Sequence, residues 1–130
     1  MKKALFAYVA TLLAFLVLDG LWLGVLMGPT YKALLGSLML DQPRLAPAAV
    51  FYLLYIVGCV VFVVLPAVTW QRAARLGALL GLVAYGTYDL TNWATLNGWS
   101  AQVSLMDWAW GTFATAVACT VGFWVAREAH

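Results

Sequence analysis

The stretch YDLTNWATLNGWSAQVSLMDWAW, residues 88–110, decides how the second half of the chain folds. Near its centre stands Asn97-Gly98, a dipeptide that is typical of a tight turn. Apolar runs lead away from this turn in both directions, over Leu76 to Ala94 and over Val103 to Ala126. We therefore expect two helices that run side by side in opposite directions, joined by a short polar turn.

The whole chain has the composition of a membrane protein. Of its 130 residues 65% are hydrophobic and 9% are charged, whereas a soluble domain carries roughly 25% charged residues. Crossing a bilayer takes about 20 consecutive apolar residues. Four segments come near or above this length: Ala4 to Met27, Ala46 to Val68, Leu76 to Ala94 and Val103 to Ala126. We predict an all-α, polytopic membrane protein with four transmembrane helices, in a single domain over residues 1–130.

The first span begins after Lys2 and Lys3, as a cleaved signal peptide does. Its apolar run is longer than a signal core of roughly 7 to 15 residues, and no Ala-x-Ala cleavage site follows it. We therefore expect it to be retained as a membrane helix.

Flanking cations predict the orientation, because Lys and Arg are retained on the cytoplasmic side. With the N-terminus inside, five cations flank the spans on that side and two lie outside. The five are Lys2, Lys3, Arg72, Arg75 and Arg127, and the two are Lys32 and Arg44. We predict that both termini are cytoplasmic.

A short amphipathic helix is expected on the outer surface after the first span. Gly28-Pro29 is a turn signal that ends the span. Apolar side chains then recur at helical spacing, at Tyr31, Leu34, Leu35, Leu38 and Met39. Such a pattern suits a helix that lies in the membrane interface.

Three acids fall in the outer half of the membrane in this topology. At a rise of 1.5 Å per residue, Asp19 lies about 12 Å below the outer surface, and Asp89 and Asp107 lie about 7 Å below it. An ionisable residue at the centre of a span costs roughly 2.5 to 3.5 kcal/mol, so such residues are candidates for function. The three depths are similar enough for the acids to meet.

Rows of small residues predict which helix faces pack together. In the third span, Gly77, Gly81, Tyr85 and Asp89 follow one another at intervals of four residues. In the fourth span, Asp107 lies four residues before Gly111. Both acids are therefore expected to face protein. The first span carries Gly20, Gly24 and Gly28, and Asp19 lies about 100° around the helix from Gly20.

These acids and the polar and aromatic residues near them form a predicted binding site. The candidate ligand-binding residues are Asp19, Asp89, Asp107, Tyr85, Tyr88, Asn92, Trp22 and Trp110. Trp108 is also close to the acids along the chain. A structural role is an open alternative for Asp107, which lies in the first turn of the fourth predicted span, where a negative side chain complements the helix dipole.

Other chemistries lack the residues that they need. The only histidine is His130, so a haem or zinc site held by histidines is not expected. Cys59 and Cys119 lie in apolar runs and are expected to be buried hydrophobes. We predict no cofactor and no metal. Net charge is +2 without a basic run, so nucleic acid is not an expected partner.

Five segments resemble one family of small bacterial integral membrane proteins that is described as a domain of unknown function. They are LDGLWLG (18–24), FYLLYIVG (51–58), FVVLPA (62–67), AYGTYDLTNWATLNGW (84–99) and MDWAWGTF (106–113). The resemblance covers the chain from about Leu5 to Val125. It implies a four-helix membrane fold, the bacterial inner membrane and an acid at Asp19, Asp89 and Asp107. It implies no activity.

Three functions are compatible with these features. The first is a protein that binds or transports a small amphipathic or cationic molecule, since aromatic faces attract cations and a carboxylate can exchange a proton for one. The second is an enzyme or accessory factor that acts on lipids through a catalytic acid. The third is a structural subunit of a larger membrane complex. A homodimer through a glycine row is expected if the protein transports.

Overall fold

A computed structural model describes residues 2–40 and 44–128, so that His130 lies outside the described residues. Helices and short turns account for these two segments, and neither contains a strand. The helical elements follow one another along the chain. They are α1 (Lys2–Gly20) with its π-helical continuation η1 (Leu21–Leu26), α2 (Gly28–Leu35), the 3₁₀ turn η2 (Gly36–Leu38), α3 (Leu45–Cys59) with its π-helical continuation η3 (Val60–Val64), α4 (Trp70–Thr95) and α5 (Ala101–Glu128).

The predicted all-α fold is confirmed, with three helical segments long and apolar enough to cross a membrane. These segments are Lys2–Gly24, Leu45–Val64 and Ala101–Glu128. They correspond to the first, second and fourth predicted spans. Helix α4 has 26 residues but is less apolar. The third predicted span, Leu76 to Ala94, therefore stays a prediction.

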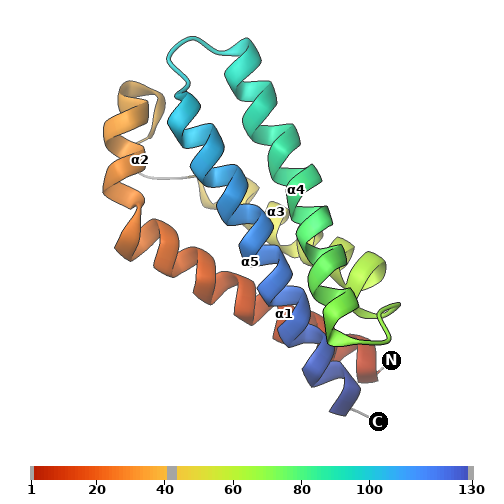
Figure 1. Cartoon of the computed structure of the whole chain (residues 1–130). Helices are drawn as coiled ribbons and strands as arrows, with labels where there is room; N and C mark the ends of the chain where they lie inside the picture. Colours follow the sequence, from red (N-terminus) through yellow and green to blue (C-terminus); the bar gives the residue numbers. More distant parts are fainter. Residues whose placement is uncertain (1, 41–43, 129–130) are drawn as a thin grey trace.

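Helices α4 and α5 lie side by side and run in opposite directions (Figure 1). The turn between them contains Gly98 at φ +80°, a left-handed conformation that glycine adopts without strain. The helical pair and the turn that the opening stretch predicts are thus present.

The first turn of α1 and the last turn of α5 lie at the same end of the molecule (Figure 1). We call the half of the molecule at this end the terminal half, and the opposite half, which contains α2 and the α4–α5 turn, the loop half.

Glycines let α4 and α5 approach closely. A Cβ at Gly81 would lie 2.6 Å from the carbonyl oxygen of Gly111, and a Cβ at Gly77 would lie 3.0 Å from the carbonyl oxygen of Thr115. The distance at Gly81 is too short for a side chain, and the distance at Gly77 is shorter than most side-chain contacts, so the two backbones approach closely at both glycines. The packing faces predicted from these two rows are confirmed.

Helix α1 packs through a different face from the one that its glycines predict. Its buried residues are Ala7, Thr11, Phe15 and Asp19, which are spaced by four. Gly122 of α5 receives this face, since a Cβ there would overlap the Thr11 side chain. A Cβ at Gly20 or Gly24 would meet nothing within 4 Å. The glycine row of α1 is therefore not a packing face within the molecule.

The expected helix after the first span is present as α2 and η2. Pro29 stands in its first turn, where the missing N–H costs nothing. Tyr31 is buried, and α2 lies beside the first half of α5 (Figure 1). This contact holds one side of α2 against α5.

Candidate functional site

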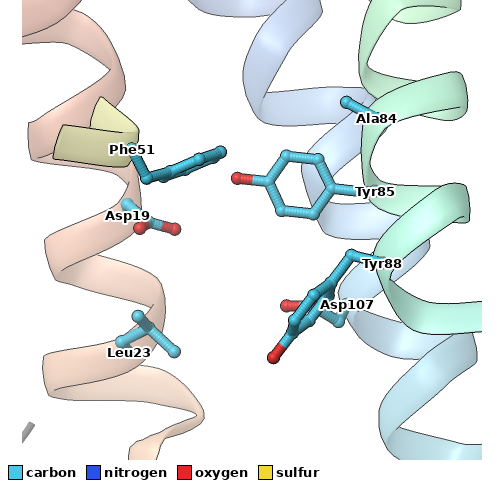
Figure 2. Close-up of a pocket in the computed structure, with 7 residues that line it drawn as sticks. All are labelled: Asp19, Leu23, Phe51, Ala84, Tyr85, Tyr88 and Asp107. Atoms are coloured by element: carbon cyan, nitrogen blue, oxygen red, sulfur yellow. The ribbon is translucent and has the colours of Figure 1, made fainter. Parts of the chain in front are cut away.

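A cavity of about 380 Å³ lies in the loop half between α1, α3, α4 and α5. Its lining residues are Asp19, Leu23, Phe51, Ala84, Tyr85, Tyr88 and Asp107. Figure 2 shows Asp19 and Leu23 on one wall, with Tyr85, Tyr88 and Asp107 across from them. Two carboxyl groups and three aromatic rings thus share one space.

Both carboxyl oxygens of Asp19 accept hydrogen bonds. The Tyr52 hydroxyl of α3 donates to one oxygen. The indole N–H of Trp110, on α5, donates to the other at 3.2 Å. Asp19 is 8% exposed, so these two donors replace most of the water that a free carboxylate would bind. The acid joins three helices at the wall of the cavity.

Asp107 accepts one hydrogen bond from the outer helix. The Tyr31 hydroxyl donates to Asp107 Oδ1 at 3.0 Å and accepts from Trp22 Nε1 at 2.9 Å. Burial and the neighbouring Asp107 raise the pKa of Tyr31 well above its ordinary value. The hydroxyl therefore remains a donor to the acid.

Stacked indole rings connect the surroundings of Asp19 with those of Asp107. Trp22 and Trp110 lie face to face, with ring centroids 4.4 Å apart and an angle of 5° between the planes. Trp110 donates to Asp19, and Trp22 donates to the tyrosine that binds Asp107. The two stacked indole rings therefore link the hydrogen bonds of Asp19 to those of Asp107.

Asp89 lies behind the cavity and does not line it. Its side chain is fully buried, and neither carboxyl oxygen has a hydrogen-bond partner among the described residues. Asp107 is its ionisable neighbour across the α4–α5 contact. The three acids therefore do come near one another, in three different environments.

The predicted placement of Asp107 in the first turn of the fourth span is wrong. Helix α5 begins at Ala101, two residues before the predicted span, so that Asp107 lies in its second turn. The first turn is capped by Ser100, whose hydroxyl accepts from the Val103 amide at 3.2 Å. Asp107 is directed toward Tyr31 and the cavity instead.

The other candidate residues divide into three groups. Tyr85 and Tyr88 line the cavity, and Trp22 and Trp110 hold the hydrogen bonds described above. Asn92 is not part of the lining. Trp108 turns away from the acids, because its indole donates to the Leu82 carbonyl at 2.8 Å and packs against Gly86. Trp108 therefore connects α5 to α4.

Sequence reasoning missed Tyr52, which donates to Asp19, and Phe51, which forms part of the lining. A signal for Tyr52 was present, because Tyr52, Tyr55 and Cys59 recur at helical spacing and mark the inner face of α3. No such signal marks Phe51, which is 42% exposed. Its place in the lining depends on how α3 packs against the other helices, which no pattern within α3 encodes.

The donor set does not suit a metal ion. Among the residues that the structure describes, no group of three or more His, Cys, Asp or Glu side chains could hold one. Cys59 and Cys119 are buried free thiols in the terminal half. What the cavity offers chemically is negative charge beside aromatic faces.

A comparison with family models finds a match over residues 4–124, which includes every residue of the cavity lining. No curated protein and no solved structure matches the chain. The predicted family resemblance is confirmed over almost the whole sequence. The chain belongs to the family described as Predicted membrane protein (DUF2177).

Proposed function

We propose that the cavity binds a small amphipathic organic cation from the outer half of the bacterial inner membrane and that the protein transports it. The observation that supports this is the pairing of two carboxyl groups with aromatic walls, with no Lys or Arg side chain in the described lining. Carboxylates attract a cation by charge, and aromatic faces attract it through their quadrupoles. The volume lies in the range of small-molecule sites.

Partly exposed side chains in the lining support entry of a ligand into the cavity from the lipid-facing side of the molecule. Leu23, Phe51 and Tyr88 are 41%, 42% and 54% exposed, so the cavity reaches the molecular surface between helices. In a membrane that surface faces lipid. A ligand with an apolar part could therefore enter from the leaflet while its charged group approaches Asp19 and Asp107.

The topology that this function requires is also a proposal. Helix α4 lies along α5 over most of its length, and α1 begins at the end where α5 finishes (Figure 1). If α1, α3 and α5 cross the membrane, α4 must cross it as well to return the chain to the same side. The cation distribution then favours cytoplasmic termini.

The direct test uses the full chain in detergent and benzyltrimethylammonium as the probe. Its neutral isostere, neopentylbenzene, has the same shape without the charge. We expect the cation to bind and to raise the thermal unfolding midpoint, and the isostere to bind at least tenfold more weakly. Equal binding of both compounds, or of neither, would refute the proposal.

Matched variants assign the binding to the cavity. Asp19→Asn and Asp107→Asn should each weaken cation binding at least tenfold, because each removes one negative charge from the lining. Glu128→Gln removes a charge at the exposed end of α5 and should leave binding unchanged. Thermal unfolding without probe establishes that each variant is folded. In liposomes, cation flux should vanish in the variants that no longer bind.

A further inference from the structure

The carboxyl of Asp89 has an environment unlike that of the other two acids. It is fully buried, and both of its oxygens lack a hydrogen-bond partner among the described residues. Its backbone is held firmly, since the Ser104 hydroxyl donates to the Asp89 carbonyl at 3.0 Å, and Trp99 donates to Ser104 at 2.8 Å. The backbone is thus held where the described residues offer the Asp89 carboxyl no donor.

An isolated carboxylate is very costly to bury, whereas a neutral carboxylic acid costs much less. Asp19 shows the contrast, because both of its oxygens accept hydrogen bonds. Asp107 accepts one, from Tyr31. The number of donors therefore falls from Asp19 to Asp107 to Asp89, and a proton is most stable on the acid that has none.

The charged and titratable groups that face Asp89 come from every element around it. Asp107 on α5 is its direct neighbour, Tyr31 on α2 contacts Asp107, Tyr88 lies on α4 itself, and Asp19 on α1 is farther away. None of these groups supplies a positive charge, and no Lys or Arg of the described residues lies beside the pair. Two adjacent carboxyl groups in such a place do not both ionise.

We propose that Asp89 and Asp107 together hold one proton, and that this pair exchanges the proton for the cation in the cavity. Asp89 is the buried member that stores the proton, and Asp107 is the member that faces the ligand. When a cation binds, the O–H bond of the shared acid breaks and the proton leaves through Asp107 to solvent. The pair then changes from one negative charge to two, and the cation offsets the added charge.

The shared proton is tested without any ligand. Infrared spectra of the full chain at neutral pH should contain the C=O stretching band of a neutral carboxylic acid, and this band should shift in D₂O. Asp89→Asn should remove the band, because Asp107 then has no second carboxyl with which to share a proton. Asp19→Asn should retain it. Absence of the band from the unaltered protein, or its persistence in Asp89→Asn, overturns the proposal.

The stability of Asp89→Asn is an independent readout. An amide has the shape of the neutral acid and carries no charge, so this variant should unfold within a few degrees of the unaltered protein at neutral pH. If Asp89 were an ionised structural group, the same change would shift the unfolding midpoint by much more. A large shift therefore also overturns the proposal.

The exchange step rests on the proposed function and has its own measurement. In weakly buffered detergent with a pH indicator dye, benzyltrimethylammonium should release about one proton per bound cation from the unaltered protein. Asp89→Asn should still bind the cation and release none. Binding without proton release in the unaltered protein overturns the exchange. If no cation binds at all, the proposed function fails, and the infrared band still decides whether the pair shares a proton.

Discussion

The two halves of the molecule are built on opposite packing rules. In the terminal half, small residues let helices touch. A Cβ at Gly122 would overlap the Thr11 side chain, a Cβ at Gly77 would be in tight contact with α5, and Ala118 and Cys119 are fully buried. In the loop half, tyrosines and tryptophans stand between the helices and bond to acids, and a cavity of about 380 Å³ remains. The comparison teaches that close helix contacts and open space lie at different ends of the same helices.

The largest expected effect lies where the α4–α5 contact is tightest. Gly81→Leu should lower the free energy of unfolding by about 3 kcal/mol or more, because its Cβ would collide with the Gly111 backbone. Unfolding in mixed detergent measures this loss. Gly20→Leu is the matched control, since nothing lies within 4 Å of a Cβ there. Equal losses in the two variants would show that close α4–α5 packing is not what stabilises the fold.

A smaller effect is expected for the hydrogen bonds of Asp19. Tyr52→Phe removes one of its two donors and leaves a buried carboxyl oxygen without a partner, which should cost about 2 kcal/mol of unfolding free energy. Tyr88→Phe removes a hydroxyl from the cavity lining that donates to no described group, and we expect it to cost little. Similar costs for both variants would mean that the bond to Asp19 contributes nothing specific.

Tyr31 tests how firmly the outer helix is attached. Tyr31→Phe breaks the chain from Trp22 to Asp107 and should cost about 1 kcal/mol. Hydrogen exchange should rise mainly in α2, while α4 and α5 remain protected. A uniform rise over all helices would instead indicate that α2 is an integral part of the core.

The same tyrosine predicts a dependence on pH. Burial and Asp107 raise the pKa of Tyr31 in the folded protein, so the folded state keeps a proton that the unfolded chain loses above about pH 10. The free energy of unfolding should therefore fall as the pH rises past that value. In Tyr31→Phe the fall should be smaller. An unchanged alkaline profile in the variant would assign the effect to other tyrosines.

The smallest expected effect concerns the start of α5. Ser100→Ala removes the cap and should cost about 0.5 to 1 kcal/mol. Because Ser100 lies outside the cavity lining, binding of benzyltrimethylammonium should be unaffected. Loss of binding in this variant would show that the α4–α5 turn and the cavity, which share the loop half, are energetically coupled.

Much of the fold was predictable because bilayer crossing depends on length and apolar composition alone. The paired helices around Asn97-Gly98, the small-residue contacts of α4 and α5 and the helix after Pro29 all follow from local patterns. Asp19 was harder to place, because the glycine row of α1 suggested one face. The spacing of Ala7, Thr11 and Phe15 marks another face, and Asp19 lies on it.

The sequence by itself determined that this chain is helical, belongs in a membrane and carries acids toward one end of its helices, since hydropathy and charge are properties of each segment alone. Only the tertiary structure decided which partner each acid has. Asp19 meets Tyr52 and Trp110, Asp107 meets Tyr31, and Asp89 meets no donor among the described residues. The reason is that hydrogen-bond partners come from different helices, and their meeting depends on crossing angles that no single segment encodes.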